Sequence, residues 1–164
     1  MIQGFTGTRA GMTAAQKDGV TRYIICETDG LPSIAMHGGA PGSDEQFDEI
    51  VTGILIGIRV AIRPCAMDRY CFWIAKGDAV VRSIYAPIAP LVRNKIIVNE
   101  SDCMIATPAE AQEQQRGGTW STIRYTRKVG KPLVVIFPDG TVIRERMPRR
   151  TTQERKVLAR ILQK

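Results

Sequence analysis

The sequence predicts an α/β domain with a Rossmann-like, mostly parallel sheet of about five strands, flanked by helices on both faces. Short apolar runs alternate along the chain with longer amphipathic stretches, a pattern typical of βαβ units with right-handed crossovers. Glycine-rich turns lie at the ends of three of these runs, where such folds pass from a strand to a helix. The chain has 164 residues, 44% hydrophobic and 24% charged, which suits one domain with a real core.

The strands are expected at the short, continuously apolar runs. These runs span residues 2–6, 33–36, 59–62, 103–106 and 133–137. A short additional strand is a candidate at 142–144, after the turn Pro138–Thr141. The stretch 65–92 is ambiguous, because Tyr70–Ile74 fits either a strand or part of a helix.

Helices are expected between the strands and at the C-terminus. They span residues 13–27, 43–55, 91–99, 119–129 and 151–162. Two of them begin with the spacing of a capping box, Thr13 with Gln16 and Ser43 with Gln46. In that motif the first side chain accepts a hydrogen bond from the backbone three residues on, so helices are predicted to begin at both places.

The net charge of +7 is concentrated in the C-terminal quarter. Residues 124–164 hold 12 Lys/Arg and 3 Asp/Glu, a balance of +9, whereas residues 1–123 hold 11 and 13, a balance of −2. We therefore divide the chain into a domain of residues 1–145 and a basic, helical C-terminal extension of residues 146–164. The extension fits a solvated tail, or a contact with a polyanion such as single-stranded nucleic acid.

Several classes of protein are not expected. The chain lacks an apolar run of the ~20 residues that a membrane helix needs, and Met1–Phe5 does not resemble a signal peptide, so a cytoplasmic protein without a membrane partner is predicted. It has four cysteines without a Cys-x-x-Cys pair and one histidine. Neither a disulfide framework nor a zinc site is therefore expected, and no metal or cofactor is predicted.

Three glycine-containing segments fall where ligands bind in open α/β sheets, at the carboxyl ends of strands. They are Gly4–Arg9, His37–Asp44 and Arg116–Thr119. Glycine lets the backbone approach a ligand, and a helix N-terminus offers free N–H groups and partial positive charge to a phosphate. The sequence lacks Gly-Lys-Ser/Thr and a strict Gly-x-Gly-x-x-Gly, so neither a P-loop nucleotidase nor classical NAD binding is predicted.

Five side chains near these segments are candidates for chemistry. Arg9 and Arg93 are candidates for phosphate binding, and Asp44 is a candidate for a ribose hydroxyl or a charge in the first turn of a helix. His37 fits a general acid or base, or a turn histidine bonded to backbone. Asp44, Glu45 and His37 are the catalytic candidates if the protein is an enzyme.

Four segments resemble, in the same order, motifs of the SLOG superfamily, which includes DNA-processing protein A and the LOG enzymes. They are Gly7-Thr8-Arg9, His37-Gly38-Gly39-Ala40-Pro41-Gly42-Ser43-Asp44, Arg93–Val98 followed by Ser101–Ala106, and Gly117-Gly118-Thr119 with Thr122, followed by Gly130–Val135. The resemblance covers residues 2–138. It implies a ligand pocket lined by Gly38, Gly39, Gly42, Asp44, Arg93, Asn94, Gly117, Gly118 and Thr119. Further candidate ligand-binding residues in the same motifs are Gly7, Thr8, Arg9, Ser43 and Thr122.

The resemblance has one departure that bears on function. LOG enzymes cleave the N-glycosidic bond of nucleotides and carry Pro-Gly-Gly-x-Gly-Thr-x-x-Glu, but here Trp120 replaces the later glycine and Arg124 replaces the glutamate. We therefore expect a module that binds a nucleotide or nucleotide-derived ligand, as a sensor or for sequestration. The alternatives are an N-glycosidic hydrolase or transferase and a single-stranded DNA-binding module like DNA-processing protein A.

The resemblance also bears on the oligomeric state. Members of the SLOG superfamily often pair subunits, so a homo-oligomer is expected, with apolar residues of 65–92 at its interface.

Overall fold

The computed structural model describes residues 1–27, 31–66 and 80–146. Seven strands form one sheet in the order β4-β3-β2-β1-β5-β6-β7. They are β1 (Ile2–Gly7), β2 (Ile34–His37), β3 (Arg59–Ile62), β4 (Val81–Ile84), β5 (Cys103–Thr107), β6 (Leu133–Ile136) and β7 (Val142–Glu145). All neighbours are parallel except β6 and β7, which pair antiparallel. The Rossmann-like fold class is confirmed, with seven strands rather than about five.

The strand that the sequence did not reveal is β4. Its residues Val81, Ser83 and Ile84 are exposed, because β4 is an edge strand. A strand without a buried face has no alternation of apolar and polar residues, so the usual sequence signal is absent. The ambiguous stretch Tyr70–Ile74 and the C-terminal extension with its helix at 151–162 lie outside the described residues.

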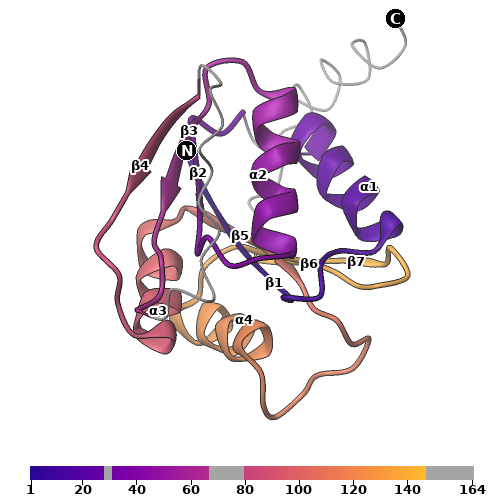
Figure 1. Ribbon diagram of the computed structural model, residues 1–164. Coiled ribbons are helices and arrows are strands. Elements are labelled where there is room, and N and C mark those ends of the chain that lie inside the picture. Colours follow the sequence, from indigo (N-terminus) through magenta and orange to yellow (C-terminus); the bar gives the residue numbers. More distant parts are fainter. Residues whose placement is uncertain (28–30, 67–79, 147–164) are drawn as a thin grey trace, which may run out of the picture.

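Helices cover both faces of the sheet. The first face carries α1 (Ala14–Arg22), which continues as a π-helical turn (Tyr23–Glu27), and α2 (Ser43–Ile54); the second carries α3 (Pro90–Glu100) and α4 (Gly118–Val129) (Figure 1). The predicted helices of this part of the chain are present, with ends that differ by a few residues. Both faces are buried beneath helices, as expected for a parallel sheet.

One of the two predicted capping boxes is present. Thr13 Oγ1 accepts from the Gln16 N–H at 3.1 Å, and Gln16 Oε1 accepts from the Thr13 N–H at 3.0 Å. The prediction for Ser43 was wrong, because Gly42 is the N-cap of α2 and the helix start has no side-chain cap. Gln46 instead accepts a hydrogen bond from the Met12 N–H at 2.6 Å. It thus joins α2 to the loop after β1.

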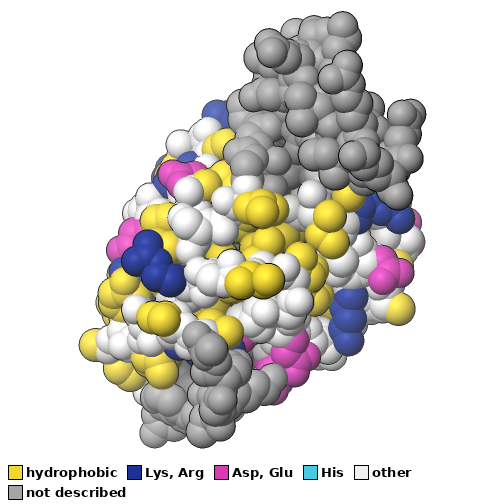
Figure 2. Space-filling model, turned by 90° about the horizontal axis from the view of Figure 1, so that it is seen from above, with side chains coloured by type: hydrophobic (Ala, Val, Ile, Leu, Met, Phe, Trp, Pro, Cys, Tyr) yellow, Lys and Arg dark blue, Asp and Glu magenta, His cyan; other side chains and the backbone are white. Residues whose placement is uncertain are grey.

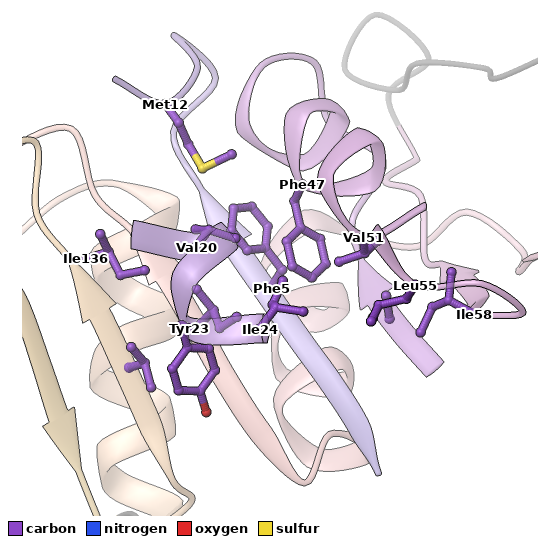
Figure 3. Close-up of a cluster of buried hydrophobic side chains, with 13 residues drawn as sticks. Phe5, Met12, Val20, Tyr23, Ile24, Phe47, Val51, Leu55, Ile58 and Ile136 are labelled. Carbon is purple, nitrogen blue, oxygen red and sulfur yellow. The ribbon is translucent and has the colours of Figure 1, made fainter. Parts of the chain in front are cut away.

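The core consists of two hydrophobic clusters, one on each face of the sheet. In the first, Phe5 of β1 stacks on Phe47 of α2 with ring centroids 4.3 Å apart and planes 6° apart (Figure 3). In the second, Met104 of β5 belongs to the same cluster as Trp120 and Ile123 of α4. Burial of each such large side chain contributes about 1.5–3 kcal/mol. The central strands β1 and β5 are therefore packed on both faces.

The surface combines scattered charges with exposed apolar residues. On the face shown in Figure 2, acidic and basic side chains are spread around a central group of hydrophobic side chains. On β4, directly after it and at the start of α3, the exposed large hydrophobic residues are Val81, Ile84, Tyr85, Leu91 and Val92. They belong to the region expected to form a subunit interface, and the homo-oligomer stays a prediction. Within the described residues, no helix has the length and apolar character needed to cross a membrane.

Candidate ligand-binding site

A cavity of about 380 Å³ lies beside the carboxyl ends of β1 and β5. These two strands are neighbours, and β1 pairs with β2 on its other side. The order of strands therefore reverses between β1 and β5, which is the switch point where open α/β sheets bind ligands. The volume is within the range of about 300–1,000 Å³ that is usual for small-molecule pockets.

Most of the expected pocket residues form the wall of this cavity. They are Gly7, Thr8, Arg9, Asp44, Arg93, Asn94, Gly117, Gly118, Thr119 and Thr122. The expected residues Gly38, Gly39, Gly42 and Ser43 are not part of the wall, nor are His37 and Glu45. The structure thus brings together three of the four motifs, and only Asp44 represents the motif that begins at His37.

The glycines of that motif are required by packing within the protein. The guanidinium of Arg93 occupies the place that a Cβ on Gly38 would take. Gly42 has a φ of 88°, and a Cβ there would collide with the carbonyl oxygen of Arg9. The loops after β1 and β2 therefore approach each other backbone to backbone, and the Ser43 N–H donates to the Thr8 carbonyl at 3.1 Å.

The backbone donors of the same turn already have acceptors. Asp44 Oδ2 accepts from the N–H groups of Gly38 and Ala40 at 3.1 Å each, and the Gly39 N–H donates to His37 Nδ1 at 3.1 Å. A phosphate bound through Gly38 and Gly39 would have to displace these bonds. We therefore correct that expectation: the β2–α2 turn uses its N–H groups to hold its own shape.

Asp44 has a structural task of its own. It lies in the first turn of α2, where a carboxylate suits the positive end of the helix. Its Oδ2 atom accepts two backbone hydrogen bonds and lies 3.8 Å from Arg93 Nη1. The side chain is only 7% exposed. Asp44 therefore positions the turn and Arg93, which agrees with the expectation of a charge in the first turn of a helix, and its contact with a ribose hydroxyl stays a prediction.

Arg93 of α3 is the buried cation of the cavity. The residue is 8% exposed, and its Nε atom is buried without a hydrogen-bond partner among the described residues. A buried donor left without an acceptor costs about 1–3 kcal/mol. Because the Nε atom has almost no accessible surface, a ligand in the cavity would meet the accessible part of the Arg93 side chain, whose positive charge suits an anionic ligand.

The N-terminus of α4 is open toward the cavity. Its N-cap, Gly117, has a φ of 114° and supplies no side-chain cap, in contrast to the capped start of α1. The first N–H groups of a helix have no acceptor within the helix. At Gly118 an added Cβ would meet only Asn94 Nδ2, at 3.9 Å. Packing within the protein thus does not require glycine at position 118. A ligand that approaches the backbone closely at this position would require it, because a side chain would occupy the same space.

His37 belongs to a buried network instead of the cavity. The residue is fully buried, and its Nε2 lies 3.1 Å from Asp48 Oδ2. Arg82 Nη2 lies 2.8 Å from Asp48 Oδ1. Burial alone would raise the pKa of Asp48, but the hydrogen bonds and charges of His37 and Arg82 outweigh it and lower that pKa below its usual value. Of the two expectations for His37, the turn histidine bonded to backbone is the one that its position supports.

Among the wall residues that were not expected site residues, three have side chains that bear on ligand binding. They are Glu110, Arg116 and Trp120. Trp120 Nε1 donates to Glu110 Oε2 at 3.0 Å, which fixes the loop after β5 against α4. Arg116 directly precedes the Gly117-Gly118 pair, and its place in that glycine segment was the sequence signal that could have indicated it. No group of three or more His, Cys, Asp or Glu able to hold a metal occurs among the described residues.

Comparison with known proteins supports the fold. The structure resembles that of the molybdenum cofactor binding protein from the phototrophic bacterium Rippkaea orientalis, with a TM-score of 0.58 and 17% sequence identity. The match covers 98% of this chain and 83% of the other. No family model and no curated protein matches the sequence. The chain therefore has an α/β, Rossmann-like fold shared with a ligand-binding protein, and the SLOG assignment stays a prediction.

Proposed function

We propose that the protein is a SLOG-type module that binds a nucleotide or nucleotide-derived ligand in the cavity beside β1 and β5, as a sensor or for sequestration. The observation that carries this proposal is the uncapped N-terminus of α4, where Gly118 leaves the space in front of the helix empty. Such a terminus combines free N–H groups with a partial positive charge, and both favour a phosphate.

The remaining wall suits the other parts of a nucleotide. Arg93 lines the cavity and supplies positive charge for an anion in addition to the helix N-terminus. Phe5, Leu91 and Ile97 add apolar surface to the same wall. A few polar groups among apolar ones are the usual composition of a small-molecule pocket. Because the structural neighbour is a molybdenum cofactor binding protein, that cofactor joins the nucleotides as a ligand to be tested.

The test is a thermal-shift screen of nucleoside mono-, di- and triphosphates, cyclic nucleotides, ADP-ribose, the molybdenum cofactor and a short single-stranded oligonucleotide. A ligand that binds only the native state raises the Tm by mass action. Gly118→Leu should abolish the shift, because the side chain fills the space before α4. Gly53→Leu is the matched control, since Gly53 is also helical, has nothing within 4 Å of an added Cβ, and lies outside the cavity wall.

The outcomes separate the proposal from its alternatives. A small-nucleotide shift that Gly118→Leu removes and Gly53→Leu keeps supports it, and the absence of any shift refutes it. A shift with the oligonucleotide alone favours the DNA-binding alternative.

N-glycosidic hydrolysis is a second candidate, because the wall holds two carboxylates, Asp44 and Glu110. Asp44 Oδ2 is occupied by two backbone N–H groups, whereas Glu110 is exposed, so Glu110 is the better candidate for chemistry. Release of free base from the nucleotide that binds, lost in Glu110→Gln, would establish this activity.

A further inference from the structure

The segment 108–117 between β5 and α4 is attached to α4 by side chains. Arg124 donates to the carbonyl oxygens of Gln114 at 2.6 Å and Gln115 at 2.9 Å. Arg127 Nη1 lies 2.8 Å from Glu113 Oε2. Residues 109–117 are all exposed, so the segment is not held by a hydrophobic core. These contacts and the hydrogen bond of Trp120 to Glu110 hold it against α4 instead.

The same contacts pair the two carboxylates of the segment, Glu110 and Glu113, with residues of α4, whereas the cation Arg116 has no such partner among the described residues. Glu110 accepts from Trp120, and Glu113 faces Arg124 and Arg127. Within the described part of the chain, no hydrogen bond or ion pair joins Arg116 to another residue. Arg116 lines the cavity one residue before the N-cap of α4. An exposed guanidinium, without an ion-pair partner among the described residues, therefore lines the cavity together with the N-terminus of the helix.

We infer that Arg116 binds the terminal phosphate of the ligand and that Arg124 is a positioning residue that holds Arg116 in place. The inference rests on the proposed function and makes it more specific. A guanidinium presents paired donors that match phosphate oxygens, and the helix N-terminus adds positive charge at the same point. This combination favours a phosphomonoester, with a charge of about −1.5 to −2 at pH 7, over a phosphodiester, which carries one negative charge.

Arg124 also accounts for the departure from the LOG motif. The residue at this position is an arginine whose guanidinium binds carbonyl oxygens of the preceding segment. Arg124 is not part of the cavity wall. It acts on the ligand through the position of Arg116 and Gly117. These two residues directly follow Gln115 in the sequence, one of the two residues whose carbonyl oxygens Arg124 binds.

The positioning role is tested without a ligand, by NMR relaxation of the backbone amides in segment 108–117. Arg124→Gln should lower their order parameters, because two hydrogen bonds that hold the carbonyl oxygens of Gln114 and Gln115 weaken. Lys128→Gln is the control: Lys128 is an exposed cation on the same helix and outside the cavity wall. Equal order parameters in wild type and Arg124→Gln would overturn the positioning role, whether or not a nucleotide binds.

The ligand role is tested by calorimetric titration with 5′-AMP and 3′,5′-cyclic AMP, and with the matching 5′-nucleotide and cyclic pair of another base if the screen selects it. Arg116→Gln should weaken the 5′-nucleotide by about tenfold or more, the usual value of a charged hydrogen bond. It should change cyclic-nucleotide binding little, and Lys128→Gln should change neither. Unchanged 5′-nucleotide affinity in Arg116→Gln overturns the inference while leaving the proposed function intact. If wild type binds no probe, the proposed function and the role of Arg116 both fail, and the relaxation experiment still decides the role of Arg124.

Discussion

The guanidinium of Arg93 lies over the backbone of Gly38, in the space where a side chain at position 38 would stand. Asp44 Oδ2 accepts from the Gly38 N–H and faces Arg93 at 3.8 Å, so the three residues form one unit. The glycine thus serves the cavity indirectly. It gives an arginine from α3 room to lie against the loop after β2 and to present its edge to the cavity.

The first prediction concerns Gly38→Ala. The added methyl group must displace Arg93, because there is no other space for it, and displacement of a packed group typically costs about 1–3 kcal/mol. We expect a lower Tm in calorimetry and loss of the ligand found by the screen. Gly53→Ala is the control; it meets no atom within 4 Å and should raise the stability of α2 by about 0.5–1 kcal/mol. Wild-type affinity in Gly38→Ala would show that Arg93 has no part in binding.

The second prediction separates binding from stability at Arg93. Arg93→Met keeps much of the apolar stem but removes the buried donor that lacks a partner. The variant also leaves Asp44 Oδ2 without the cation that faces it at 3.8 Å, and loss of one partner of a buried charge pair costs about 3–5 kcal/mol. Asp44→Asn in the same chain removes the charge left behind, so we expect the double variant to recover most of the lost free energy of unfolding while ligand affinity stays lost. Urea denaturation measures the recovery, and wild-type ligand affinity in the double variant would show that Arg93 has no part in binding.

The fold was predictable because its central strands carry a strong local signal. The runs around Phe5 and Ile105 are buried on both faces, and such strands read as short, continuous apolar stretches. Edge strands lack this signal, as β4 shows. The capping box at Thr13 was predicted correctly from spacing, but the same spacing at Ser43 was misleading. There the Ser43 N–H donates to the carbonyl oxygen of Thr8, a residue distant in the sequence. The spacing of residues within the helix carries no information about such a long-range contact.

The cavity was predictable in outline and less so in the roles of its residues. Strand ends followed by glycine and a helix indicated the region correctly, since parallel strands bring their carboxyl ends to one edge. The roles of Gly38, Gly39 and Asp44 depend on which donor meets which acceptor in three dimensions. The single histidine was a misleading cue, because its side-chain partner Asp48 belongs to α2, and Asp48 in turn pairs with Arg82 of β4. Pairings over such distances have no local pattern in a sequence.

The third prediction concerns the pH dependence of stability. The pKa of Asp48 is lower in the folded protein than its ordinary value of 3.8. The contribution of this carboxylate is therefore complete above that ordinary value and is lost as the pH falls toward the folded pKa. At pH 7, Asp48→Asn should cost roughly 3 kcal/mol, because it breaks a buried charge pair with Arg82. The difference from wild type should shrink as the pH falls below about 4.

Urea denaturation from pH 7 to pH 2.5 measures this difference. Asp139→Asn is the surface control, because that exposed carboxylate has its pKa lowered chiefly by the backbone N–H of Thr141 and then by the Thr141 hydroxyl. Its replacement should change stability little at any pH. A cost of Asp48→Asn that is the same at pH 7 and pH 2.5 would contradict the assignment, since the charge of Asp48 would then make no contribution.

The fourth prediction concerns two hydroxyl groups buried beneath Gly7. Ser43 Oγ and Thr107 Oγ1 both lack a hydrogen-bond partner among the described residues, and both lie against Gly7, a residue of the cavity wall. Thr107→Val replaces an unsatisfied hydroxyl by a methyl group of the same shape in a strand, where β-branched residues fit well. We expect a gain of about 1 kcal/mol in the free energy of unfolding, since a buried unpaired polar group is costly.

Thr126→Val is the matched control for that gain. Thr126 is equally buried, but its hydroxyl donates to the Thr122 carbonyl at 2.8 Å, so its replacement should give no increase in stability. The pair of variants isolates the effect of an unpaired hydroxyl from that of added apolar volume. If Thr107→Val instead lowers stability, the Thr107 hydroxyl has a partner in solution, and a water molecule held beneath Gly7 is the partner that this buried site would accommodate. Gly7 would then separate the cavity from a second polar site at the end of β1, and ligand binding in Thr107→Val would show whether the two are coupled.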